Sequence, residues 1–569
     1  MTDDQGYGDL GCHGNPIVQT PTIDRFYQNA VRLTDFHVGP TCSPTRAGLM
    51  TGRSANRTGV WHTIGGCSIL RKEETTVAQL FQQEGYETGI FGKWHLGDTY
   101  PARPEDKGFT HTVIHKGGGV GQSPDYWGND YFDDSYFVNG LVKKFKGYCT
   151  DVWFDEAIDY ITRVKDKPFF CYISTNAPHS PFNVPAEYYE PYKEYDIPES
   201  QKRFYGMISN IDDNFEKLQS ALDRLDLTNN TILIFMTDNG TSMGYKQIDG
   251  KWVGYNAGMK GTKNSEYEGG HRVPFFISYP NGNIGGGKDV STLTANVDLL
   301  PTLTNLCGLK LPNRQLDGLD ITPILTGEKN QLNRDYLITD SQRLQEPQKW
   351  KKSAVMSGTW RLVNGKELYD IASDLKQDKD LAAVHPQKVS TLRGYYEEWW
   401  TSVSEQFSEY PTINVGTSYE NPVTIASHDA HVEVTTNPWH QNHVLEGKKN
   451  PLGGVFIIDF ENSGNYELAI SRWPFESDLA INVGVADERK ATIYTDSIPA
   501  GKAHNFVSGG VKVGGWKQEA SIKEGATELS FKGYFPKGLK NVEAWFTNSE
   551  NNNWGAYFLR ITKLENSKS

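Results

Sequence analysis

One short stretch of the chain combines a cysteine, a proline and an arginine in a spacing that points to chemistry. It reads Cys42-Ser-Pro-Thr-Arg46 and continues Ala-Gly-Leu-Met-Thr-Gly-Arg53. With six cysteines in the chain, proline at +2 and arginine at +4 would arise by chance only about 0.015 times. Proline in a first turn predicts that Cys42 lies at a helix N-terminus, where free backbone N–H groups and the helix dipole favour an anion.

Other polar side chains form four short motifs, three of which follow apolar segments that are typical of buried strands. They are the Asp3-Asp4 pair near the start, Gly92-Lys93-Trp94-His95-Leu96-Gly97 after residues 88–92, Pro178-His179-Ser180-Pro181 after residues 168–174, and Asp238-Asn239-Gly240 after residues 231–236. Taken singly, each is as well explained by a solvated turn or a structural loop. In α/β folds, ligands bind at the carboxyl ends of strands, so together they are candidate site residues.

These motifs resemble the type I, formylglycine-dependent sulfatases of the alkaline-phosphatase-like superfamily. Formylglycine-generating enzymes recognise Cys-x-Pro-x-Arg, and the string GKWHLG is characteristic of sulfatases. The segment Lys263-Asn-Ser-Glu-Tyr-Glu-Gly-Gly-His-Arg-Val-Pro274 is similar to a third family element, although Lys-Asn-Ser-Glu departs from the usual Lys-Gly-Thr-Thr. The resemblance covers about residues 3–400 and implies a sulfuric ester hydrolase of the arylsulfatase type that acts on a polysaccharide.

The resemblance implies a covalent mechanism. Cys42 would be oxidised to 3-oxoalanine (formylglycine), whose hydrate attacks sulfur through one hydroxyl and expels sulfate by C–O cleavage through the other. Lys93 would anchor the hydrate and the sulfate, and His95 would accept the proton of the hydrate. His179 would contact sulfate and protonate the leaving alcohol, a role shared with Lys263. The positive field around the sulfate would come from Arg46, Lys93 and Lys263.

The resemblance also implies a bound metal and a maturation partner. The metal ligands would be Asp3, Asp4, Cys42, Asp238 and Asn239. Carboxylate and amide oxygens are hard donors, which suit Ca²⁺ and, less strictly, Mg²⁺. The metal would hold the sulfate and lower the charge barrier to attack. Cys42 would be oxidised by a formylglycine-generating enzyme or an anaerobic sulfatase-maturating enzyme.

The sugar that carries the sulfate is not defined by these motifs. Tyr126 and Trp127 lie in a loop rich in glycine and aromatic residues, which stacks on sugar rings or is an ordinary insertion. His62 follows the Cys42 helix and is a candidate for the leaving-group pocket. An added β-domain favours a sulfated algal polysaccharide or its oligosaccharides, such as ulvan, carrageenan or fucoidan, or a glycosaminoglycan. The alternatives are a phosphate or phosphonate ester hydrolase of the same superfamily and a non-catalytic glycan-binding protein.

The elements that must position these residues alternate between helix and strand over the first part of the chain. Apolar residues at gaps of 3, 4, 3, 4 and 3 over 208–225 predict an amphipathic helix. Residues 231–236 form a continuous apolar run, typical of a strand buried on both faces. We therefore expect a catalytic α/β domain over residues 1–330, with a large, mostly parallel sheet between helices.

The remaining chain has a different pattern. Residues 331–408 carry short strand-like segments before a helical stretch near 387–403, which predicts a small α+β subdomain. Residues 409–569 lose helical periodicity and consist of short β-rich segments separated by Gly, Pro and Asn, among them 480–485 and 491–494. This pattern predicts an accessory β-sandwich.

Composition and charge narrow the class of protein. The net charge of −13 argues against a nucleic-acid partner, which needs an excess of cations. No apolar run approaches the roughly 20 residues that span a bilayer.

Sulfatases normally carry an apolar strand immediately before the Asp3-Asp4 pair; only Met1 and Thr2 precede it, so we expect a misplaced or trimmed start. No signal peptide is visible, and the resemblance implies a periplasmic or secreted protein.

Overall fold

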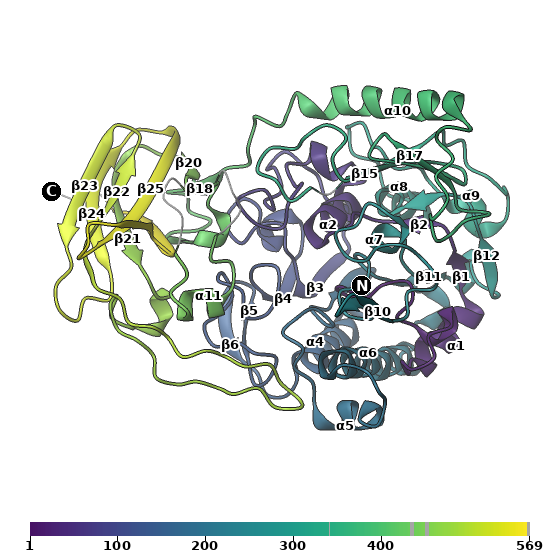
Figure 1. Cartoon of the computed structure of the whole chain (residues 1–569), viewed down its shortest axis with the longest axis horizontal. Coiled ribbons are helices and arrows are strands. Elements are labelled where there is room, and N and C mark those ends of the chain that lie inside the picture. The colour runs from purple at the N-terminus through teal and green to yellow at the C-terminus, as the bar shows by residue number, and fades with distance from the viewer. Residues whose placement is uncertain (341, 433–436, 450–453, 566–569) are drawn as a thin grey trace.

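The computed structural model describes residues 1–340, 342–432, 437–449 and 454–565. An α/β lobe and a C-terminal β-rich lobe lie side by side, and the long helix α10 (Pro386–Ser404) runs along the outside of the α/β lobe (Figure 1). Within the described ranges, no helix is both long enough and apolar enough to cross a membrane.

Two sheets form the centre of the α/β lobe. The first has the order β6 (Leu141–Lys144), β5 (Ser135–Val138), β4 (His111–His115), β3 (Glu87–Lys93) and β7 (Phe169–Ser174), with β4, β3 and β7 parallel. The second has the order β12 (Lys288–Val290), β1 (Val31–Leu33), β11 (Phe275–Ser278) and β8 (Leu233–Met236), with β11 antiparallel to both neighbours. The prediction of one large, mostly parallel sheet is thus only partly right, because the strands form two smaller sheets.

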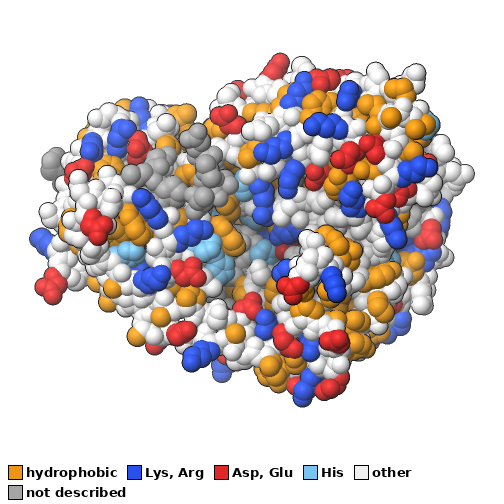
Figure 2. Space-filling view, viewed as in Figure 1, with side chains coloured by type: hydrophobic (Ala, Val, Ile, Leu, Met, Phe, Trp, Pro, Cys, Tyr) orange, Lys and Arg blue, Asp and Glu red, His pale blue; other side chains and the backbone are white. Residues whose placement is uncertain are grey.

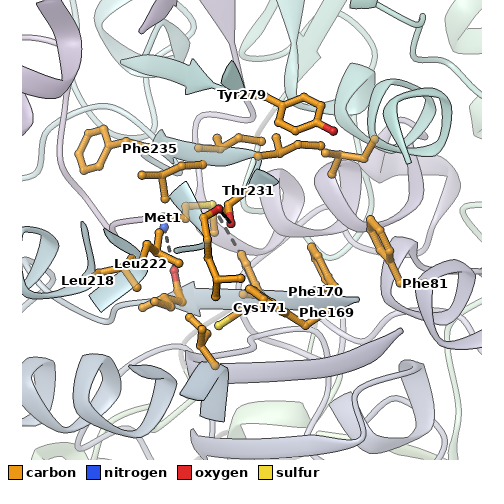
Figure 3. A pocket seen from close by; sticks show the side chains of 18 of the residues that line it. Met1, Phe81, Phe169, Phe170, Cys171, Leu218, Leu222, Thr231, Phe235 and Tyr279 are labelled. Atoms are coloured by element: carbon orange, nitrogen blue, oxygen red, sulfur yellow. Dashed lines mark hydrogen bonds between the residues drawn. The ribbon is translucent and has the colours of Figure 1, made fainter. Parts of the chain in front are cut away.

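The first residues of the chain join the facing edges of these sheets. The Met1 amino group donates to the Ile173 carbonyl at 2.8 Å, and the Thr2 N–H donates to the Met236 carbonyl at 3.1 Å. Next to them, between β7 and β8, lies a cavity of about 700 Å³ lined by apolar side chains, including Phe169, Cys171, Leu222 and Phe235 (Figure 3). The sheets stay separate because only Met1 and Thr2 bridge the two strand edges. The expected additional apolar strand stays a prediction.

Helices cover both faces of the first sheet. Neighbouring residues of a strand point to opposite faces, and Ile90 and Phe91 of β3 accordingly lie in two different apolar clusters. The Phe91 cluster contains α1 (Pro21–Asn29), α4 (Cys149–Val164) and α6 (Glu199–Arg224); the Ile90 cluster contains α2 (Cys42–Thr51), α3 (Val77–Gln83) and α8 (Leu299–Leu306). Helix α6 confirms the helix predicted from the apolar spacing: the first five of the six positions are buried along it, and the sixth, Leu225, is half-buried at its C-terminal end.

Short elements complete the lobe. They are β2 (Phe36–His37), α5 (Ala186–Tyr189), β9 (Tyr245–Ile248), β10 (Lys251–Gly254), α7 (Glu268–His271), β13 (Thr294–Ala295) and α9 (Thr322–Thr326). A four-stranded antiparallel sheet follows in the order β14 (Leu337–Asp340), β15 (Ser353–Ser357), β16 (Trp360–Val363) and β17 (Glu367–Asp370), and α10 packs on β15 and β16. This is the expected α+β arrangement; the domain limits themselves stay predictions.

A buried arginine ties this sheet to the α/β core. Arg361 on β16 donates to Glu268 Oε1 at 2.7 Å and to Asp35 Oδ1 at 2.8 Å. His37 and His271 lie against the same carboxylates, and His37 Nε2 is 2.8 Å from Asp35 Oδ1. The histidines and Glu268 are close enough to hold a metal ion, but Arg361 already neutralises the carboxylates, so we assign the group a structural role.

Replacing Arg361 with methionine is expected to destabilise the protein by about 3–5 kcal/mol, because two buried carboxylates lose their cation. The free energy of unfolding in urea is the measurement. Arg25→Met is the matched control: Arg25 pairs with Glu216 at the surface, where both side chains are more than half exposed. Loss of that pair is expected to change stability by no more than about 1 kcal/mol. Equal changes in the two variants would contradict the structural role.

The C-terminal lobe is a β-sandwich. One sheet contains β18 (Ile413–Val415), β20 (Phe456–Phe460), β25 (Gly538–Asn548), β22 (Phe506–Val513), β23 (Trp516–Ser521) and β26 (Asn553–Gly555). The other contains β19 (Val423–Ala426), β27 (Phe558–Lys563), β21 (Gly464–Ser471) and β24 (Leu529–Phe535). Residues of both sheets share one apolar cluster, which is the core between the two layers.

Two segments expected to be strands, 480–485 and 491–494, are not strands. They belong to an irregular arm that reaches across to the α/β lobe. The Tyr494 carbonyl accepts from the Val184 N–H at 3.1 Å, and Asp496 pairs with Arg203 at 2.5 Å. The two halves of the arm pair with each other only at two isolated bridges, Val485 with Gly501 and Arg489 with Ile498, so no continuous strand ladder forms. Other polar groups of the arm are satisfied on the α/β lobe.

Candidate active site

The candidate residues converge at one edge of the two sheets. Lys93 is the last residue of β3, the loop carrying His179 follows β7, and Asp238 follows β8. Thr2 pairs in parallel with Thr237, which brings the following Asp3-Asp4 pair to the same edge. Because β3 and β7 are parallel, their carboxyl ends meet there, as the sequence predicts.

Cys42 is the first residue of helix α2, which confirms its predicted place at a helix N-terminus. Every residue of the helix is buried, and Cys42 Sγ lies 3.4 Å from Asp3 Oδ1. Burial, and then the charge of Asp3, raises the pKa of the Cys42 thiol to about 12. The unmodified thiol is therefore protonated at neutral pH and is a weak nucleophile.

A buried acidic cluster surrounds Cys42. Ligand atoms of Asp3, Asp4, Cys42 and Asp238 all lie within 4.8 Å of one another. Burial, and then Asp3, raises the pKa of Asp238 to about 6, a sign that these carboxylates repel one another. The Asn239 amide donates to Asp4 Oδ1 at 3.0 Å, whereas its own Oδ1 is buried without a hydrogen-bond partner. This orphaned oxygen and the hard carboxylate donors fit a divalent cation such as Ca²⁺.

Two lysines pair with carboxylates of the acidic cluster. Lys93 Nζ lies 2.5 Å from Asp3 Oδ2, and Lys263 Nζ lies 2.5 Å from Asp4 Oδ1. Burial opposes the charge of Lys263, but Asp4 raises its pKa above the usual value. A divalent cation on the carboxylates would compete for these contacts and free both ammonium groups for an anion.

Arg46 lies behind the cluster. Its Nη2 donates to Asp238 Oδ2 at 2.8 Å, and its Nη1 donates to the Lys93 carbonyl at 3.1 Å and to Ser174 Oγ. Arg46 is buried, and it is not among the residues that line the active-site cavity next to Cys42. Arg46 therefore holds Asp238 and the ends of β3 and β7 in position, and its contribution to the site is electrostatic and indirect.

His95 occupies a constrained position beside Cys42. Its backbone has a φ of 59°, and its Nε2 donates to the Thr63 carbonyl at 2.9 Å. Its Nδ1 is buried without a partner, and burial, followed by the charge of Lys93, holds its pKa well below the ordinary value. A Cβ at Gly118 would lie 2.3 Å from the His95 ring, so this glycine lets the loop close over the imidazole. The ring presents an unprotonated nitrogen, as a proton acceptor requires.

His179 lies on the opposite side of the cluster. Its Nδ1 donates to the Ser180 carbonyl at 2.6 Å, and its Nε2 lies 3.8 Å from Asp4 Oδ2. The Tyr131 hydroxyl donates to the His179 carbonyl at 2.6 Å and fixes the loop. Burial lowers the His179 pKa to about 3, so the ring is neutral in the absence of ligand.

A cavity of about 410 Å³ opens over these groups. It is lined by Asp4, Cys42, His62, His95, His179 and Lys263, among others, so His62 lies where the sequence places it. Tyr126 and Trp127 are not among the residues that line this cavity, and their contact with substrate stays a prediction. Trp127 packs edge-on against Trp473, with ring centroids 5.5 Å apart, because burying two large rings together is favourable.

Sequence reasoning missed several residues that line or support the cavity. Arg343 and Trp439 line it, although they come from the parts of the chain beyond residue 330. Gln122 also lines it and accepts from the Gly118 N–H at 2.8 Å through its side chain. Gln122 lies in the same glycine-rich loop as Tyr126 and Trp127, so the loop itself was a signal for this residue. No local sequence motif marks Arg343 or Trp439 as site residues.

Comparisons with known proteins agree with this geometry. A family model described as Sulfatase matches residues 1–309, and one described as N-sulphoglucosamine sulphohydrolase, C-terminal, matches residues 262–390. Arylsulfatase A of Homo sapiens is 31% identical over 366 residues, covering 58% of this chain and 67% of that protein. Arylsulfatase G of Rattus norvegicus is 29% identical over 377 residues, covering 58% of this chain and 68% of that protein.

Among solved structures, the crystal structure of Ps i-CgsB in complex with k-i-k-neocarrahexaose has a TM-score of 0.64 and 27% sequence identity. The match covers 72% of this chain and 93% of that chain. The Sulfatase model alone spans more than half of the 569 residues. The chain therefore belongs to the sulfatase family, within the alkaline-phosphatase superfamily, and is a sulfuric ester hydrolase.

Proposed function

We propose that the protein removes sulfate from a sulfated carbohydrate, with formylglycine at position 42 as the nucleophile and Ca²⁺ in the acidic cluster. The observation that carries this proposal is the buried group of Cys42, three carboxylates and the orphaned Asn239 oxygen, flanked by Lys93 and Lys263. A carbohydrate substrate is supported by the similarity to Ps i-CgsB, which was crystallised with k-i-k-neocarrahexaose. An algal oligosaccharide is the class we favour.

Each group of site residues would have a different role in hydrolysis. Asp3, Asp4, Asp238 and Asn239 would hold the cation, which supplies positive charge next to the sulfate oxygens. Oxidation of Cys42 by a maturation enzyme replaces an inert thiol with a hydrated aldehyde. Lys263 lines the cavity and Lys93 pairs with Asp3 of the acidic cluster, and both would bind the anionic group. His95 accepts a proton through the free Nδ1, since its Nε2 is held by Thr63.

His179 would protonate the leaving oxygen. Its Nδ1 is held by the Ser180 carbonyl, and its Nε2 lies 3.8 Å from Asp4 Oδ2, on a residue that lines the cavity. The ring is neutral in the free protein, so it must gain its proton as the anionic substrate enters and offsets the nearby lysines.

The variant His179→Gln is expected to lower kcat/KM for a sugar sulfate by about 10²-fold or more, because an alkoxide leaving group needs a proton. An aryl sulfate, whose phenoxide leaves more easily, is expected to lose less than about tenfold. The two values are measured on the same matured preparation. His385→Gln, an exposed histidine on α10's N-terminal side, is the control and is expected to change neither value. Equal losses on both esters would refute the role in leaving-group protonation.

The whole proposal is tested by two measurements on one sample. Mass spectrometry of the peptide that contains Cys42 reports the aldehyde, and sulfate release is followed with an aryl sulfate, matched phosphate and phosphonate esters, and a panel of sulfated oligosaccharides. We expect aldehyde together with sulfate release and a preference for sulfate over phosphate. A verified aldehyde with no sulfate release from any ester would overturn the proposal.

A further inference from the structure

The active-site cavity is built by three separate parts of the chain. The catalytic α/β core contributes the acidic cluster and its lysine and histidines, the loop before β15 contributes Arg343, and the segment before α11 (Gln441–Leu445) contributes Trp439. Figure 2 shows histidine, lysine and arginine side chains gathered in the hollow between the two lobes. Part of the cavity wall is therefore supplied by chain that lies outside the catalytic core.

Arg343 is an exposed cation in this wall, and no carboxylate among the described residues pairs with it. Within the described residues, it has no ion pair and its side chain makes no hydrogen bond. By contrast, Lys93 and Lys263 both pair with carboxylates of the cluster. Arg343 and His62 line the same cavity. A planar guanidinium with free N–H groups is suited to bind an anionic group through paired hydrogen bonds.

Trp439 is held over the same cavity by contacts between the lobes. Its carbonyl accepts from the Ser123 N–H at 3.0 Å, and the Gln441 N–H donates to the Gly121 carbonyl at 2.9 Å. The Gln441 side chain donates to three further carbonyls of the same loop, those of Gln122, Asp125 and Tyr126. These contacts fix an aromatic ring at the rim, where it offers apolar area at little entropic cost. Trp439 also lies outside both segments that match family models.

We propose that Arg343 and Trp439 form a sugar-binding subsite that recognises a second anionic group, a sulfate or a carboxylate, on the saccharide whose sulfate ester is hydrolysed. The proposal rests on the proposed function and adds a substrate class to it. Trp439 covers the apolar face of the sugar, and Arg343 binds the anion away from the nucleophile. The C-terminal lobe thereby becomes part of the active site through Trp439.

The test uses the full chain with the aldehyde at position 42 verified by mass. Wild type, Arg343→Ala, Arg343→Lys and Trp439→Ala are compared on an aryl sulfate, a singly sulfated disaccharide, a disulfated disaccharide and a sulfated disaccharide that contains a uronate. Each saccharide is measured as a substrate and as a competitive inhibitor of aryl sulfate hydrolysis, so binding is read even where turnover is slow. Arg224→Ala and Trp252→Ala are matched controls, because both side chains are exposed and lie outside the cavity.

On a saccharide with a second anion, we expect Arg343→Ala to lower kcat/KM, or to raise the inhibition constant, by roughly 10- to 100-fold. This effect is expected to be at least tenfold larger than the effect on the aryl sulfate. Arg343→Lys is expected to recover part of this loss, and Trp439→Ala to weaken every saccharide more than the aryl sulfate. The saccharide on which Arg343→Ala shows the larger loss, the disulfated one or the one with a uronate, identifies sulfate or carboxylate as the second anion. Equal losses on all substrates, or wild-type indifference to the second anion, would overturn the subsite. Absence of aryl sulfate hydrolysis by the matured wild type would instead overturn the proposed function.

Discussion

Replacing Cys42 with alanine is expected to lower kcat/KM for every sulfate ester by about 10⁴-fold or more, because no nucleophile remains at the helix N-terminus. The more informative change is Cys42→Ser. A serine hydroxyl is expected to attack sulfur and release the alcohol once per chain, since the single hydroxyl provides no route for C–O cleavage. The measurements are a burst of alcohol without turnover and the mass gain of one sulfo group on the peptide that contains residue 42.

The control for these variants is Cys307→Ala, which removes a half-buried cysteine at the end of α8, far from the acidic cluster in the chain. Its activity is expected to remain within about twofold of the wild type. The unmodified wild-type thiol supplies a second comparison. With its pKa raised to about 12, unconverted Cys42 is expected to be as inactive as the alanine variant. Sulfate ester turnover by unconverted enzyme would contradict the assignment of formylglycine.

Removing one carboxylate of the acidic cluster is the second large effect that we expect. Asp4 has a φ of 65°, a conformation that asparagine adopts readily, so Asp4→Asn removes the charge with little backbone strain. The variant loses a hard metal ligand and the partner of Lys263 and His179. We expect kcat/KM to fall by roughly 10³-fold, as several kcal/mol of charge stabilisation are lost.

Thermal unfolding separates metal binding from catalysis in this variant. Ligand binding to the native state raises Tm, so a chelator is expected to lower the Tm of the wild type and added Ca²⁺ to restore it. Asp4→Asn is expected to show a much smaller response. Asp226→Asn is the matched control, because Asp226 is an exposed aspartate with a φ of 57°. An unchanged Ca²⁺ response in Asp4→Asn would refute the metal assignment for this carboxylate.

Local sequence was sufficient for the parts of this protein that depend on short-range physics. The spacing of Cys42, Pro44 and Arg46 predicted a helix that begins at the cysteine, and α2 begins there. The 3.6-residue periodicity predicted α6, since a helix must bury one face. Polar motifs after apolar strands predicted an edge where they meet, because parallel strands end on the same side of a sheet.

Tertiary structure alone decided which side chains reach the substrate cavity. Trp127 looked suited to a sugar but is packed against Trp473, whereas Trp439 lines the cavity from a different lobe. Arg46 carries the family motif but lies behind Asp238, and Arg343 carries no motif but stands at the rim. The division of the central strands into two sheets, joined through Met1 and Thr2, was also invisible in local patterns. Periodicity fixes which residues are buried, but contacts between segments hundreds of residues apart depend on how whole layers pack.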